Sequence, residues 1–194
     1  DRNRNGLLDG DINPNNGNPG IPNVTVQLLS VADDGVTLTL VATDVTDASG
    51  YYLFDQTGDQ SVLNGGDLLE PGNYIVRIPV SNFNAGNALA NYYSTATLVG
   101  GTGDDEPVDN DDNGIDQRDL SLPTLTPINI DSETINLSGY DETTAEADAD
   151  KSPTDGDGRY GIRDDSSNLT VDFGFFVPLS LGNRVWLDAD NNAL

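Results

Sequence analysis

Two short stretches of the sequence place oxygen-bearing side chains at alternate positions. In residues 1–6, DRNRNG, the oxygen donors are Asp1, Asn3 and Asn5, and a glycine follows. In residues 109–114, DNDDNG, they are Asp109, Asp111 and Asn113, again followed by a glycine. EF-hand-type calcium loops have oxygen ligands at positions 1, 3 and 5, glycine at position 6 for a sharp turn, and a backbone carbonyl at position 7. The two stretches therefore predict calcium sites, with the position-7 carbonyls supplied by Leu7 and Ile115.

The second half of each loop departs from the EF-hand pattern. Position 12, normally a bidentate Glu, is Ile12 in the first loop and Leu120 in the second, whereas position 11 is Asp11 and Asp119. Asp9 adds a further carboxylate to the first loop. We expect two or more bound Ca²⁺ ions, with the remaining ligands coming from other parts of the chain.

Two looser acidic clusters are weaker candidates for metal binding. DADKSPTDGDG contains Asp148, Asp150, Asp155 and Asp157, and DADNN contains Asp188 and Asp190. The competing explanation is that Asp, Asn and Gly are simply the residues that turns prefer. The match between the two main loops favours calcium there, and for the looser clusters both explanations stay open.

The composition excludes several classes of function. The 194 residues include 33 acidic and 8 basic ones, for a formal net charge of -25. Nucleic acids and anionic membrane surfaces need a basic footprint, so neither is expected as a partner. Cys and His are absent, which removes disulfides, zinc thiolate sites and histidine-based catalysis. We find no catalytic constellation and expect neither an enzyme nor a small-molecule substrate.

The elements that must position these loops are predicted to be strands. Alternating apolar residues predict strands over 23–31, around 36–45 and over 71–80. An aromatic strand is expected after a turn at 47–50, and further strands over 168–178 and 181–188, with weaker candidates at 96–100 and 133–140. No segment has a sustained helical period, so helix is not expected beyond a turn or two. The long acidic connections at 55–70, 84–118 and 139–167 exceed the usual loop length. The sequence thus predicts an all-β sandwich.

Several phrases, in order, resemble the B-type repeat of the serine-aspartate repeat surface proteins of bacteria, in the prealbumin-like group that includes the collagen-adhesin B domains. They are GIPNVTVQLL, TDASGYYLFD, LLEPGNYIVRI, DNDDNGID, SNLTVDFGFF and LGNRVWLDAD, together with the first loop. The resemblance implies a Greek-key β-sandwich with long acidic calcium-binding loops, outside the cell or on its surface. It implies a calcium-stiffened structural repeat of a filament, stalk or surface protein. The alternative is an adhesin module that binds a host, sugar or neighbouring-cell ligand through its long loops.

The order of the phrases differs from that family in one respect. Modules of the family begin with the GNRVWLD strand and then continue into the calcium loop, whereas here that strand comes last. We therefore expect residues 1–178 to be a module lacking its own first strand, and residues 179–194 to be the first strand of the next module. An unfilled sheet edge is an association site. The expected partners are copies of the chain or adjoining repeats, joined head to tail through Leu181, Val185, Trp186 and Leu187.

Overall fold

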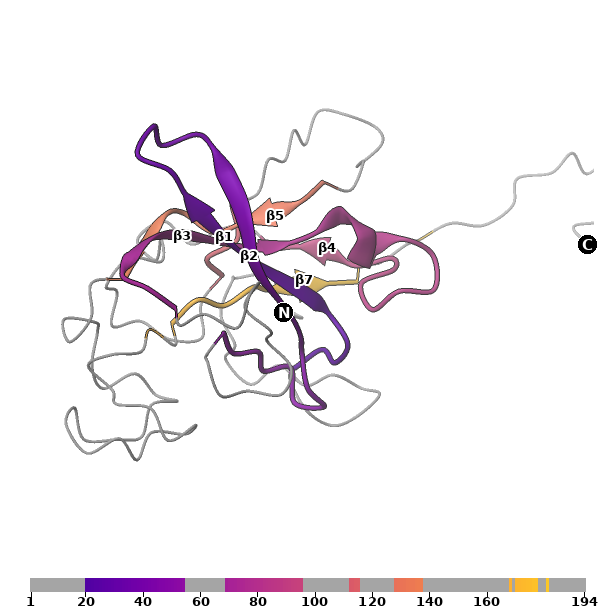
Figure 1. Cartoon of the computed structure of the whole chain (residues 1–194). Coiled ribbons are helices and arrows are strands. Elements are labelled where there is room, and N and C mark those ends of the chain that lie inside the picture. Colours follow the sequence, from indigo (N-terminus) through magenta and orange to yellow (C-terminus); the bar gives the residue numbers. More distant parts are fainter. Residues whose placement is uncertain are drawn as a thin grey trace, which may run out of the picture.

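The computed structural model describes residues 20–54, 69–95, 112–115, 128–137, 168, 170–177 and 181. Within these ranges the secondary structure is β, apart from one short 3-10 helix, η1, over Val80–Phe83. Figure 1 shows the strands gathered into one body from which the β1–β2 hairpin projects. No helix in the described ranges is long and apolar enough to cross a membrane.

Five of the described strands form one antiparallel sheet. Its order is β2-β1-β3-β5, and β6 also pairs with β3. The bounds are β1 Thr25–Val31, β2 Leu38–Val45, β3 Gly72–Ile78, β5 Ile130–Asp131 and β6 Ile135–Leu137. A second sheet pairs β4 (Tyr93–Ser94) with β7 (Phe175–Phe176), also antiparallel. The predicted all-β class is thereby confirmed in its coarse form, as two antiparallel sheets.

Alternation of side chains explains the three long strands. In β1, Val26 and Leu28 are buried, while Thr25 before them and Gln27 between them are only partly buried. Leu28 lies opposite Ala42 on β2 and Val76 on β3, both of them buried. The register between β1 and β2 shifts between Leu28 and Leu29, which is a bulge. One face of the sheet is therefore the side that the core covers.

The core joins this face to chain segments from later in the sequence. One buried cluster contains Val26 and Val76 from the sheet together with Leu89, Val171 and Phe175. Phe83 of η1 lies edge-on to Phe175, with 6.0 Å between the ring centroids. Residues 80–92 and 170–177 thus contribute side chains to the same core as the sheet, and Phe175 of β7 is one of them.

The buried side-chain amide of Asn82 fixes the start of the segment 80–92. Asn82 donates from Nδ2 to the carbonyl of Thr25, and its Oδ1 accepts the Thr25 amide, both at 2.8 Å. The side chain of Asn82 thereby takes the place of a neighbouring strand beside the first residue of β1. Because Asn82 is only 3% exposed, these bonds also satisfy polar groups that burial would otherwise leave unpaired.

Some sequence predictions of strand extent were wrong. Residues 51–54, predicted as an aromatic strand, have no regular structure, because Asp44 Oδ2 accepts the Leu53 amide at 2.9 Å. Among the described residues of 168–178, only Phe175–Phe176 forms a strand. The connection 84–118 is not wholly loop, since it contains β4 and a bridge from Ile115 to Asp131. The candidate strand at 96–100 lies outside the described residues.

Candidate functional site

Few of the predicted metal ligands lie in the part of the chain that the structure describes. Asn113 and Ile115 do. The others lie outside the described residues: Asp1, Asn3, Asn5, Leu7, Asp9, Asp11, Asp109, Asp111, Asp119, Asp188 and Asp190. Of the predicted assembly residues, Leu181 is described and fully exposed, whereas Val185, Trp186 and Leu187 are not described. The calcium and assembly sites remain predictions. Of the second predicted calcium loop, the structure describes Asp112–Ile115.

The segment Asp112–Ile115 joins three distant parts of the chain. The Asn113 amide donates to the carbonyl of Asp172 at 3.0 Å, and the Asp172 amide donates to Asn113 Oδ1 at 2.6 Å. Two residues further on, the Ile115 amide donates to the carbonyl of Asp131 on β5 at 2.8 Å. The middle of the second predicted calcium loop is therefore held to both the large sheet and the segment that leads into β7.

Asp112 fastens the same segment to the end of β4. Its Oδ2 accepts a short hydrogen bond from the Thr95 hydroxyl, and its Oδ1 accepts the Gly114 amide at 3.0 Å. The Thr95 amide in turn donates to the carbonyl of Gly174 at 3.0 Å. Asp112 and Thr95 are both 0% exposed, so the hydrogen bond between them pairs two polar groups that burial removes from water.

Two glycines make the close packing around Asp112 possible. A Cβ added at Gly114 would lie 2.8 Å from Ile130 Cγ2 and 3.1 Å from Phe173 Cδ1. A Cβ added at Gly174 would collide with Thr95 Oγ1. Gly114 was expected to be required by the sharp turn of a calcium loop; the structure adds a packing reason for it.

Sequence reasoning missed Asp112. It lies at position 4 of the loop, which is not a ligand position in the EF-hand pattern. The signal available was the mismatch between the two loops, since position 4 is Arg4 in the first and Asp112 in the second. Its burial depends on Thr95 and Gly174, whose proximity the sequence does not reveal.

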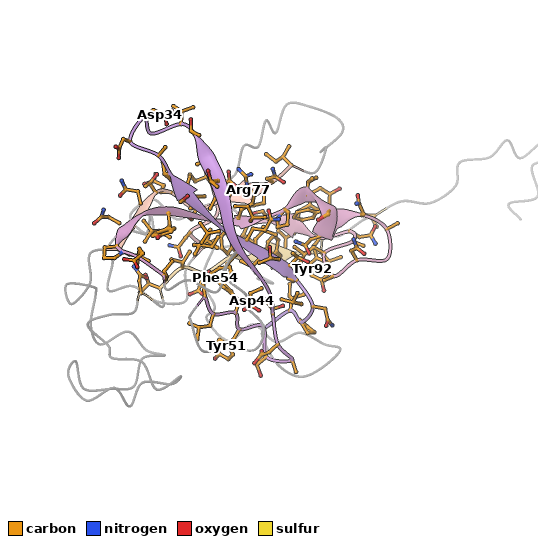
Figure 2. All side chains as sticks on the ribbon, viewed as in Figure 1. Asp34, Asp44, Tyr51, Phe54, Arg77 and Tyr92 are labelled. Carbon is orange, nitrogen blue, oxygen red and sulfur yellow. The ribbon has the colours of Figure 1, made fainter. Side chains whose placement is uncertain are left out.

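A second buried acid lies at the end of β2. Asp44 is 4% exposed, and its Oδ1 accepts the Val45 amide at 2.7 Å while Oδ2 accepts the Leu53 amide. Figure 2 shows Asp44 near Tyr51 and Phe54, far from Asp34 at the tip of the hairpin. The side chain thus fastens the irregular segment 51–54 to the sheet.

Tyr52 links residues 51–54 to the segment 170–177. Its hydroxyl donates to the carbonyl of Val171 at 2.5 Å. Burial raises the pKa of Tyr52 well above its ordinary value, and the negative charges of Asp172 and Asp44 raise it further. Asp172, whose backbone pairs with Asn113, therefore also acts electrostatically on Tyr52.

The donors near Asn113 fit a hard cation in kind. Carboxyl, amide and carbonyl oxygens are what Ca²⁺ prefers, and neither His nor Cys is present in the chain. An amide oxygen has two lone pairs, so the bond from Asp172 to Asn113 Oδ1 is compatible with a second ligand. Among the described residues alone, no group of three or more acidic, His or Cys side chains could hold a metal ion. A complete site at this loop would need residues beyond these ranges.

Comparison with known proteins adds no further evidence. No protein-family model matches the chain, and no significantly similar curated protein or solved structure was found. The resemblance to B-type repeats therefore rests on the sequence phrases alone.

Proposed function

We propose that the chain is a calcium-stiffened structural repeat or subunit of an extracellular bacterial filament, stalk or surface protein. In this proposal the units are prealbumin-like β-sandwich modules joined end to end by donation or continuation of a strand. Calcium held by the two matched loops neutralises part of the acidic charge and braces the module.

The observation that supports this proposal best is the anchoring of Asp112–Ile115. These residues form the middle of the second loop, and their hydrogen bonds reach Thr95, Asp172 and Asp131. An ion bound by Asp109, Asp111 and Asn113 would act on a segment that already connects the two sheets. Binding there would stabilise the packing of the sheets and not only a surface loop.

The net charge gives calcium an energetic role. A compact chain with a formal charge of -25 repels itself, and cations bound only to the folded state relieve that repulsion. Such binding stabilises the fold by mass action, by about 2.7 kcal/mol at a free concentration 100 times the dissociation constant. A stalk whose modules gain this much from calcium would soften when the metal is removed.

Head-to-tail joining is supported by the order of the sequence phrases. The GNRVWLD phrase follows the last strand of the module, and its alternation predicts a strand that must pair with some sheet. We expect residues 181–188 to lie in the next unit, with Asp188 or Asp190 near the loop that begins at that unit's Asp1. Calcium would then lie at the joint between units.

Chelation with a matched pair of variants tests the calcium proposal. We expect EGTA to lower the melting temperature of the wild-type chain at modest ionic strength. Asp111→Asn should weaken this response, because it removes a ligand charge. Asp33→Asn is the control, since it changes the charge equally at an exposed position of the hairpin tip. A melting temperature indifferent to chelator, or an equal effect of both variants, would count against the proposal.

A polypeptide containing two successive units tests the joint. Trp186 is the only tryptophan, so its fluorescence reports on the predicted strand directly. Replacing Trp186 by Phe in one unit at a time separates the signals. We expect emission from the first unit's Trp186 to shift to shorter wavelength when the second unit follows it. Identical emission with and without the second unit would contradict strand donation.

A further inference from the structure

The Asn113–Gly114 pair has a chemistry that neither calcium binding nor strand donation uses. Asn–Gly sequences deamidate more readily than other Asn sequences, because glycine has no side chain to hinder attack by its own nitrogen. The chain has four such pairs, at residues 5–6, 16–17, 64–65 and 113–114. Only the last lies in the described part of the chain, and there both residues are buried.

The reaction requires two groups to move together. The Gly114 nitrogen loses its proton and bonds to Asn113 Cγ, the bond from Cγ to Nδ2 breaks, and ammonia leaves. Water then opens the resulting succinimide at either carbonyl. The product is Asp, or an isoaspartate whose backbone is one methylene longer.

The fold holds both groups in other bonds. The Gly114 amide donates to Asp112 Oδ1 at 3.0 Å, and Asn113 Oδ1 accepts the Asp172 amide at 2.6 Å. Asp112 is itself fixed by the Thr95 hydroxyl. With Asn113 only 1% exposed, water also lacks access to the carboxamide. Attack by Gly114 therefore needs the segment to open first.

The product would not fit the folded structure. An isoaspartate adds a backbone atom beside Gly114, where even a Cβ would come within 2.8 Å of Ile130 Cγ2. The simple Asp product would place a second carboxyl group next to buried Asp112. Modification after opening therefore prevents the same packing from forming again.

We propose that Asn113 is a deamidation site that the fold keeps closed, so that its conversion is an irreversible record of opening of residues 112–115. The Asp112–Thr95 hydrogen bond is the clasp that keeps it closed. This inference does not depend on calcium or on assembly, because the protecting bonds are all between residues of the chain.

Peptide mapping by mass spectrometry tests this inference. Cleavage after arginine isolates residues 78–118 with the basic side chain of Arg118, and electron-transfer fragmentation of this peptide separates Asp from isoaspartate at position 113. The protein is incubated at one pH and temperature, with and without urea. We expect Asn113 to deamidate at least about tenfold more slowly without urea, since reaction then requires local opening. Equal rates in the two conditions would overturn the proposal.

A pair of threonine variants tests the clasp. Thr95→Val removes the hydroxyl donor while keeping the side-chain shape, and we expect it to speed conversion of Asn113 severalfold without urea. Thr43→Val, at an exposed position on β2, is the control and should leave the rate unchanged. If Thr95→Val folds and its rate equals that of the wild type, the clasp is wrongly assigned. If it does not fold, the urea comparison on the wild type still decides the proposal.

Discussion

Asp34 at the hairpin tip and Asp112 in the core have the same side chain, but the first is exposed to solvent and the second is buried. Asp34 lies on the exposed tip of the β1–β2 hairpin, and within the described part of the chain it accepts hydrogen bonds from Val36 and Thr37 beside it. Asp112 is fully buried and accepts one from Thr95, distant in sequence. At the tip, Asp forms a local turn; at Asp112, it holds separate segments together. A charge of -25 therefore says little about where the acids matter for stability.

Removing the carboxyl group of Asp112 should have the largest effect on stability. Asp112→Ala leaves the Thr95 hydroxyl and the Gly114 amide buried without their acceptor, which costs about 2–4 kcal/mol. Urea unfolding monitored by circular dichroism measures the loss. Asp34→Ala is the comparison, and its midpoint should stay close to that of the wild type. Similar losses for the two variants would remove the distinction between the regions.

The second-largest effect on stability is expected from a substitution of Gly114, which packs closely beside Asp112. Gly114→Ala brings a Cβ within 2.8 Å of Ile130 Cγ2, so we expect a cost of about 1–3 kcal/mol from overpacking. Gly72→Ala is the matched control on β3, where the nearest atom to an added Cβ is 3.5 Å away. It should be neutral or stabilise by about 0.4–1 kcal/mol through the unfolded state. Thermal unfolding of the two variants, with calcium held constant, compares them.

The dependence of stability on alkaline pH should report on Tyr52, which is partly buried, in contrast to the exposed hairpin tip. Because its pKa is raised in the folded state, its contribution to stability is complete below its ordinary value of 10.0 and is lost as the pH rises beyond it. Tyr52→Phe should cost about 1 kcal/mol at neutral pH, through loss of the bond to Val171. It should also flatten the decline in stability above pH 10. A decline as steep as in the wild type would mean that another group causes it.

The smallest effect is expected at the hairpin tip under acid. Hydrogen bonds from the Thr37 hydroxyl and from the amides of Thr37 and Val36 lower the pKa of Asp34 from 3.8 to about 2. The stabilisation that Asp34 provides is therefore present above pH 3.8 and is lost as the pH falls through about 2. The protection of the Val36 and Thr37 amides, which is the intrinsic exchange rate at each pH divided by the observed rate, should fall over that range, as nuclear magnetic resonance would detect. Unchanged protection there would show that the carboxylate does not hold the tip.

The sequence predicted the three long strands, and its candidate strands at 133–140 and 168–178 contain the short strands β6 and β7, whereas β4 and β5 were not predicted. β1, β2 and β3 each have enough alternation to specify a buried face. β4 and β5 have two residues each, and they exist because a neighbouring segment pairs with them. A two-residue pairing leaves no period in the sequence, so it depends on contacts that only the folded chain provides.

The candidate site divides in the same way. The spacing of oxygen donors predicted Asn113 and Ile115 as part of a loop that needs a glycine. The same spacing did not predict a role for Asp112, because that role depends on Thr95, which lies 17 residues earlier in the chain. The strand predicted over residues 51–54 was wrong for a similar reason. The amide of Leu53 donates to the side chain of Asp44 on β2, and this bond could not be read from the sequence.

The metal content of the folded protein tests the central proposal most directly. The wild-type chain is equilibrated with calcium and dialysed extensively into chelator-free buffer, and its ions are then counted by native mass spectrometry and by elemental analysis. The calcium-stiffened repeat predicts two or more calcium ions per chain, with one lost in a variant that combines Asp109→Asn and Asp111→Asn. Fewer than one calcium ion per wild-type chain would contradict it.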